Sequence, residues 1–151
     1  MWCGSRAGWK RQDKTNLWWK AMANTPAIAD FCTKHPGFVL YGEVYGQVQN
    51  LKYGTEPGEV RFAAFDVLEL HGAFLNAMEG RDLCQSFNVP VVPMIGEVGF
   101  DFEEVCNLAE GLSLVPEASH IRDGCVVKPM IERFHQAVGR VQLKVVSAGY
   151  L

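Results

Sequence analysis

Residues 38–45 read FVLYGEVY, a run of aromatic and β-branched side chains with no helix-favouring pattern. Such side chains favour extended backbone because they pack well on a pleated surface. Alternate residues of a strand face opposite sides. We therefore expect one face to carry Val39, Tyr41, Glu43 and Tyr45 and the other to carry Leu40, Gly42 and Val44. An acidic side chain between two tyrosines is a candidate acceptor for a hydroxyl group or a metal-bound water, although an edge-strand glutamate in water explains the pattern more simply.

A second stretch of the same kind, VRFAAFDVLEL at residues 60–70, predicts a partner strand beyond a glycine-containing loop at 46–59. Helix-start and helix-stop signals and apolar runs place the other elements. We expect helices at 16–22, 25–34, 79–87 and 101–110, and strands at 89–95, 121–130 and 138–147. Helices and strands mix without strict alternation and no linker divides them. The prediction is one α+β domain over residues 1–151, built on antiparallel sheet.

Composition excludes several classes of protein. With 48% hydrophobic and 21% charged residues the chain is globular, and its net charge of −3 gives no overall basic field. Any contact with nucleic acid must therefore come from a local patch. No apolar run reaches membrane-spanning length, and no signal peptide opens the chain. Five scattered cysteines without a CxxC pair indicate reduced thiols and a cytoplasmic location.

Two of the predicted strands carry charges that folding does not require. IRDGCVVKPM at 121–130 has an acid near its start and a lysine near its end, so these charges either reach solvent or face a ligand. In the last predicted strand, one face is expected to carry Arg140, Gln142 and Lys144, and the other Val141, Leu143 and Val145. Cationic and amide donors on one face suit an anion such as phosphate, although a solvated sheet face is the simpler explanation.

Five short motifs become specific when they are taken together and in order. They are GSR at 4–6, LYGEVYG at 40–46, FAAFDV at 62–67, IRDGCVVKP at 121–129 and LKVVS at 143–147. In this order and spacing the chain resembles the nucleotidyltransferase core of the RNA ligase family, within the superfamily of ATP-dependent ligases and mRNA capping enzymes. The resemblance implies an antiparallel-sheet, ATP-grasp-like adenylation core that uses ATP. It also implies sealing of RNA 5′-phosphate and 3′-hydroxyl ends, including those of a nicked duplex, through a lysyl-AMP intermediate.

The same resemblance implies roles for individual residues. Arg6 would contact the nucleotide or the donor end, Glu43 would accept the ribose hydroxyls, and Phe65 would stack on adenine with Asp66 supporting the site. Lys144 and Lys128 would meet phosphate oxygens. Asp123 would bind the catalytic divalent metal, Mg²⁺ or Mn²⁺, which helps a nucleophile approach a crowded, negatively charged phosphoryl centre.

The sequence departs from the family pattern in three places. Asp123 stands where the family usually has glutamate, one methylene longer, although aspartate can still serve a magnesium ion through water. Val146 replaces a lysine that often follows the one matched by Lys144. The family's nucleophile lies in a KxDG or KxxG strand upstream of GSR, and the only KxxG match, at 34–37, sits at a predicted helix end before a proline. We therefore expect a core that is incomplete at its N-terminus, without a C-terminal domain.

Three interpretations remain open at this point. The chain is a truncated RNA ligase that is inactive alone, or one half of a split ligase whose partner chain supplies the lysine strand, or a nucleotide- or RNA-binding module that has lost catalysis. Asp123 and Val146 count for the last interpretation. The motif residues Arg6, Glu43, Phe65 and Lys144 count against it.

Overall fold

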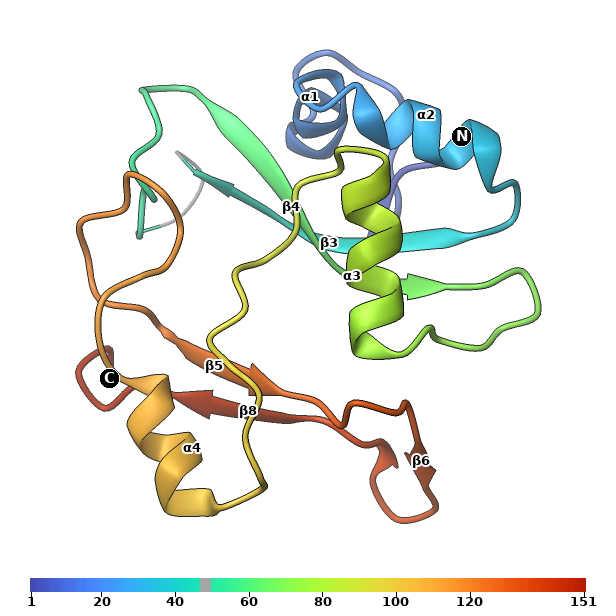
Figure 1. Ribbon diagram of the computed structural model, residues 1–151. Coiled ribbons are helices and arrows are strands. Elements are labelled where there is room, and N and C mark those ends of the chain that lie inside the picture. Colours follow the sequence, from blue (N-terminus) through green and yellow to red (C-terminus); the bar gives the residue numbers. More distant parts are fainter. Residues whose placement is uncertain (47–49) are drawn as a thin grey trace.

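The computed structural model describes residues 1–46 and 50–151 (Figure 1). At its N-terminus β1 (Gly4–Ser5) and β2 (Gly8–Trp9) pair antiparallel, and two helices follow, α1 (Leu17–Ala23) and α2 (Ala27–Lys34). The Asn16 side chain caps α1 by accepting hydrogen bonds from two backbone amides of its first turn. Both predicted helices are confirmed, although α2 begins after Pro26 without a side-chain cap.

The central hairpin consists of β3 (Val39–Gly46) and β4 (Val60–Leu68), paired antiparallel. Its register runs regularly to the pair Gly42–Ala64 and then steps to Tyr41–Asp66, so Phe65 is an extra residue in β4. Such a β-bulge bends a strand and redirects a side chain. Burial alternates along β3 as far as Val44, in agreement with the two predicted faces.

One face of this hairpin packs on the helices and forms the core. α3 (Ala77–Ser86) joins α2 there, and it begins two residues before the predicted start, in a capping box between Asn76 and Glu79. The buried cluster consists of Ile28, Phe31, Ala64, Val67, Cys84 and Val89. Gly42 is required on this face, since a Cβ there would lie 2.1 Å from the Phe62 ring.

A second sheet pairs β5 (Gly124–Val127) with β8 (Leu143–Val146), antiparallel, and α4 (Phe102–Ala109) packs beside it after its Asp101 cap. A separate hairpin joins β6 (Phe134–His135) to β7 (Gly139–Arg140). The predicted strand at 138–147 is therefore wrong as one element. It is two short strands with different partners.

The predicted strands at 89–95 and 121–130 also need correction. In the first range only Val91 forms a bridge, parallel to Ala64, and two backbone hydrogen bonds of 2.7 and 2.9 Å hold it there. In the second, regular pairing covers only β5, and Ile121 bridges Leu112 separately. An apolar run can indicate extended backbone without showing how many of its residues find a partner strand.

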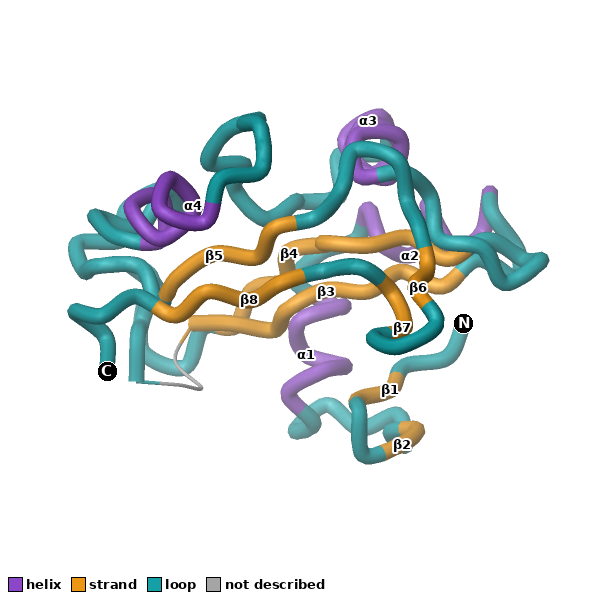
Figure 2. Tube along the Cα trace, turned by 90° about the horizontal axis from the view of Figure 1, so that it is seen from below, coloured by secondary structure: helices purple, strands orange, loops and turns teal. Residues whose placement is uncertain are grey.

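The two main sheets lie in separate layers. In Figure 1 the β3–β4 hairpin lies between α1 and α2 on one side and the β5–β8 pair on the other. Figure 2, seen from below, shows β5 and β8 lying across β3 and β4, with α3 and α4 along the same flank. The result is a mixed fold of helices and small antiparallel sheets. Among the described residues no helix is long and apolar enough to cross a membrane, and the five cysteines are free thiols.

Gly124 gives a direct test of how the second sheet is built. Its φ is +133°, and a Cβ there would lie 2.0 Å from the Val145 carbonyl oxygen. We predict that Gly124→Ala lowers the free energy of unfolding by about 2–5 kcal/mol, through backbone strain and overpacking. Gly99→Ala is the control, because a Cβ at that residue meets open space, and it should change stability by less than about 0.5 kcal/mol. Urea denaturation measures both, and equal stability of the two variants would contradict the packing described.

Candidate functional site

A buried carboxylate connects the two halves of the molecule. The side chain of Asp66, on β4, is only 8% exposed and accepts a 2.7 Å hydrogen bond from Lys128 Nζ. Arg140 approaches the same carboxylate with both terminal nitrogens, at 2.5 and 2.8 Å. Lys128 directly follows β5 and Arg140 lies in β7. One side chain of the first sheet therefore fixes two elements of the second half of the chain.

A second carboxylate completes this ionic cluster. Arg140 also donates to Glu132 from Nε at 2.9 Å and from Nη2 at 2.6 Å, and its guanidinium carbon lies 3.8 Å from the centre of the Phe74 ring. The backbone amide of Glu132 donates to Asn76, the capping residue of α3. Two carboxylates thus balance two cations, which is the condition under which buried charge is tolerated.

The cluster shifts the titration of Asp66. Burial by itself would raise the pKa of this carboxyl, but hydrogen bonds from Arg140 and Lys128 and the charges of both cations outweigh it. The net effect is a pKa below the ordinary value. Hydrogen bonds to Asp66 and Glu132 in turn raise the pKa of Arg140. Both shifts favour the charged forms of Asp66 and Arg140 at neutral pH.

The bulge residue Phe65 lies directly against this cluster. Lys128 Nζ donates a second hydrogen bond, 2.7 Å long, to the Phe65 carbonyl oxygen and lies 5.5 Å from the centre of its ring. The ring itself is 42% exposed, which is unusual for a large apolar side chain next to a buried network. The structure therefore brings together three residues singled out from sequence, Phe65, Asp66 and Lys128. The amine of Lys128 is already engaged by the other two.

Glu43 lies on the same face of the β3–β4 hairpin as Asp66. Its neighbour on that face, Tyr41, pairs with Asp66, and Glu43 itself pairs with the small residue Ala63. The Glu43 side chain is exposed and makes no hydrogen bond or ion pair with another residue that the structure describes. The glycine beside it, Gly42, gives room to Phe62 on the helix side rather than to an outside group.

Asp123 and Lys144 form a loose, open pair at the other end of the second sheet. Their charged groups are 3.8 Å apart, and the side chains are 43% and 61% exposed. No cluster of three or more His, Cys, Asp or Glu side chains suited to a metal occurs in residues 1–46 and 50–151. One open carboxylate fits a magnesium ion that keeps most of its waters and binds substrate phosphates. It does not fit a metal held by the protein alone.

Arg6 lies in the turn between β1 and β2, exposed and without a hydrogen bond or ion pair to any described residue. Its expected contact with the nucleotide or the donor end stays a prediction. The predicted common face of Arg140, Gln142 and Lys144 is wrong, because the chain leaves regular pairing between β7 and β8 and Arg140 turns to Asp66. Glu132 was not anticipated at all. Its ion pair with Arg140 forms because the β6–β7 hairpin brings the two residues together, and no local spacing in the sequence indicates this.

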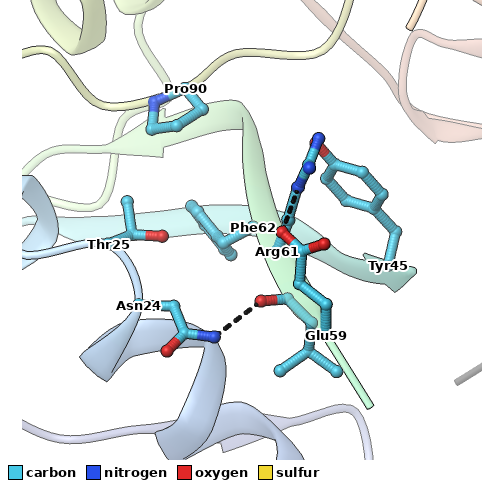
Figure 3. Close-up of a pocket in the computed structure, with 8 residues that line it drawn as sticks. Asn24, Thr25, Tyr45, Glu59, Arg61, Phe62 and Pro90 are labelled. Carbon is cyan, nitrogen blue, oxygen red and sulfur yellow. Dashed lines mark hydrogen bonds and ion pairs between the residues drawn. The ribbon is translucent and has the colours of Figure 1, made fainter. Parts of the chain in front are cut away.

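A hollow of about 380 Å³ lies elsewhere, along the edge of β4 (Figure 3). It is lined by Asn24, Thr25, Tyr45, Glu59, Val60, Arg61, Phe62 and Pro90. Its polar groups are largely satisfied within the chain: Arg61 pairs with Glu59 at 2.7 Å, and Asn24 donates to the Val60 carbonyl at 3.0 Å. Burial raises the pKa of Tyr45 here, against the opposing effect of Arg61. None of the residues with an expected role lines this hollow.

Comparisons with known proteins agree with the fold. A model of the RNA ligase family matches residues 3–146, so the chain belongs to the RNA ligase family. Structures of Naegleria gruberi RNA ligase are similar. A mutant with ATP and Mn is 23% identical, with a TM-score of 0.76 over 95% of this chain and 42% of that one. A mutant with AMP and Mn is 21% identical, with a TM-score of 0.77 over 99% and 46%.

An archaeal ATP-dependent RNA ligase is also similar in structure, with a TM-score of 0.64, 23% identity, and coverage of 89% of this chain and 34% of that one. The chain thus spans less than half the length of each of these ligases. At such identities the likeness supports the fold. No curated protein matches the sequence.

Removal of the central carboxylate tests the ionic cluster. Asp66→Asn keeps the size of the side chain but leaves two cations facing one carboxylate, so we predict a loss of about 3–5 kcal/mol in the free energy of unfolding. Glu59→Gln is the matched control, because it breaks a partly exposed pair with Arg61 and should cost far less. Urea denaturation at pH 7 distinguishes them. Similar losses would show that the Asp66 cluster is not a principal connection.

The lowered pKa of Asp66 also predicts a pH dependence. A carboxyl whose folded pKa lies below its unfolded value of about 3.9 contributes its full stabilisation above that pH. The contribution disappears as pH falls through the lower, folded pKa. The stability difference between the wild type and Asp66→Asn should therefore be constant from neutral pH to about pH 5 and shrink below about pH 4. A difference that grows in acid would contradict the assignment.

Proposed function

We propose that this chain forms the nucleotide-binding part of an ATP-dependent RNA ligase adenylation domain. The observation that supports it most strongly is the contact between two motifs 62 residues apart, where Lys128 Nζ meets Asp66 at 2.7 Å and the Phe65 carbonyl at the same distance. Membership of the RNA ligase family adds weight. ATP or AMP would bind on the face of the β3–β4 hairpin that turns away from the helices.

Five side chains on or beside this face have a chemical task in the proposal. The exposed Phe65 ring would stack on adenine, and the free Glu43 carboxylate would accept hydrogen bonds from the ribose hydroxyls. Lys128 and Asp66 would hold the bulge that presents the ring. Lys144 would meet a phosphate oxygen, which its open position permits.

Asp123 would hold a hydrated divalent ion, which neutralises phosphate charge during transfer of the nucleotide. Similar ligases have been solved with Mn and ATP or AMP, which supports a divalent metal and an adenine nucleotide here as well.

The proposed chemistry needs a lysine from outside these 151 residues. No KxDG sequence occurs in them, and Lys34, the lysine of the KxxG match, is the last residue of α2. That helix packs on the opposite face of the β3–β4 hairpin. A nucleophile must approach to about 3–3.5 Å from the α-phosphorus in line with the leaving group, and Lys34 is on the wrong side. A preceding segment or a partner chain would supply the lysine for joining RNA ends.

A module that binds nucleotide without catalysis is the second candidate. The observation that favours it is the open pair of Asp123 with Lys144. In the two motifs that contain these residues, the family commonly has a longer acid and a second lysine. Such a module would bind AMP with the same residues. The two candidates differ in whether an added lysine strand restores chemistry.

Nucleotide binding can be measured directly. By calorimetry we predict weak binding of ATP or AMP, reduced about ten-fold by Phe65→Ala through loss of stacking, and reduced also by Glu43→Gln through loss of the ribose contact. Phe102→Ala is the control, since this phenylalanine is also exposed but lies on a different element, α4. Equal binding by all four proteins would exclude the proposed face.

Self-adenylylation tests the absence of a nucleophile. Incubated with α-labelled ATP and magnesium, the chain should remain unlabelled, because Lys144 would meet a phosphate oxygen without attacking the phosphorus and Lys34 lies outside the proposed site. Addition of a peptide or partner chain that carries a KxDG strand should place the label on the added lysine. Acid-stable AMP on a lysine of these 151 residues would show that the nucleophile has been misplaced. An added strand that binds without becoming labelled would favour the non-catalytic module.

A further inference from the structure

The β6–β7 hairpin exposes an unusual concentration of apolar side chains. Ile131, Phe134 and Val138 are 73%, 77% and 71% exposed within eight residues of sequence. Isolated apolar residues are normal on a protein surface, but a cluster of this kind marks a binding surface. A hollow of about 450 Å³ lies among Arg133, Phe134, His135, Val138 and Val141. We call these five residues, with Ile131, the hairpin surface.

The charge around this surface is opposite to that of the whole chain. Residues 122–144 contain five lysine and arginine side chains and two acidic ones, a net charge of +3, whereas the chain as a whole carries −3. Asp66 and Glu132 neutralise Lys128 and Arg140. Arg133 is exposed and has no ion pair with any residue that the structure describes. Its charge is available to an outside anion.

The hairpin is held beside the proposed nucleotide site rather than being independent of it. Arg140, in β7, bonds to Asp66, and Asp66 is adjacent to the stacking candidate Phe65. Glu132, just before β6, bonds to the same arginine. Figure 1 shows the hairpin beyond the end of the β5–β8 pair, on the side away from α4. The hairpin surface is therefore tied through Arg140 to the strand that carries Phe65.

We propose that the hairpin surface binds an unpaired nucleotide of the RNA strand, with a base stacked on Phe134 and the adjoining phosphate bound by Arg133. An exposed ring beside an unpaired cation is the combination by which proteins hold single-stranded nucleic acid. A second copy of this chain fits less well, because a two-fold contact of this face with itself would bring like cations together. The inference rests on the proposed function, to which it adds a contact with the substrate.

Fluorescence anisotropy with a labelled, 5′-phosphorylated single-stranded RNA of about 12 nucleotides tests the proposal on the full chain. We expect Phe134→Ala to weaken binding about ten-fold. Arg133→Ala should weaken it and lower the slope of log K against log salt by about 1. The matched controls are Phe102→Ala on α4 and Lys34→Ala on α2, both exposed and away from the hairpin, and both should bind as the wild type does. Thermal unfolding confirms that the variants fold.

The outcomes separate this inference from the proposed function when ATP binding is measured on the same samples. RNA affinity that depends on Phe134 and Arg133 supports the hairpin surface, even if ATP fails to bind and the proposed function falls. Normal ATP binding with RNA affinity absent, or equal in all variants, overturns the inference alone. If Phe134→Ala abolishes self-association in sedimentation and leaves RNA binding unchanged, the surface is an interface between copies, which also overturns it.

Discussion

The carboxylate of Asp66 forms ion pairs with Lys128 and Arg140 at the boundary between two small antiparallel sheets. Most of the molecule's arrangement depends on these two ion pairs. In the described part of the chain neither sheet has more than two strands, so neither can bury two faces by itself. The helices cover one face of β3–β4. On the other face, the ionic cluster of Asp66, Lys128, Arg140 and Glu132 ties the second half of the chain to the first, and Glu132 also bonds to Asn76.

Backbone geometry places the side chains of the proposed nucleotide site. The bulge at Phe65 allows β4 to present an aromatic ring next to a buried carboxylate, while the residues on either side keep their core and site faces. Gly124 has a comparable role in the second sheet, because only glycine lets β5 approach the Val145 carbonyl so closely directly after Asp123. Phe65 and Gly124 both lie inside the sequence motifs that carry the family resemblance. The structure gives a physical reason for the residue types at these two positions.

Local signals predicted much of the fold. Asn16 and Asp101 cap helices as expected, and the aromatic, β-branched stretches at 38–45 and 60–70 pair as strands. The predictions that failed concern residues whose interaction partners are distant in the sequence. Nothing near Arg140 indicates that the chain breaks after it and that its guanidinium reaches a carboxylate 74 residues away. For the site, the family resemblance selected Phe65, Asp66 and Lys128, which the structure brings together. It also selected Arg6, which lies in the turn between β1 and β2 and forms no hydrogen bond or ion pair with a described residue.

We expect an adenine nucleotide to bind on the face of the β3–β4 hairpin that turns away from the helices, against the bulge that Asp66 and Lys128 hold. The most direct measurement is amide chemical-shift mapping of the isotope-labelled chain during titration with AMP and magnesium. The largest changes should cluster at Tyr41, Glu43, Phe65 and Lys144. Changes that cluster instead around Asn24, Thr25 and Pro90, at the hollow of Figure 3, would contradict it. The absence of any saturable change would contradict it equally.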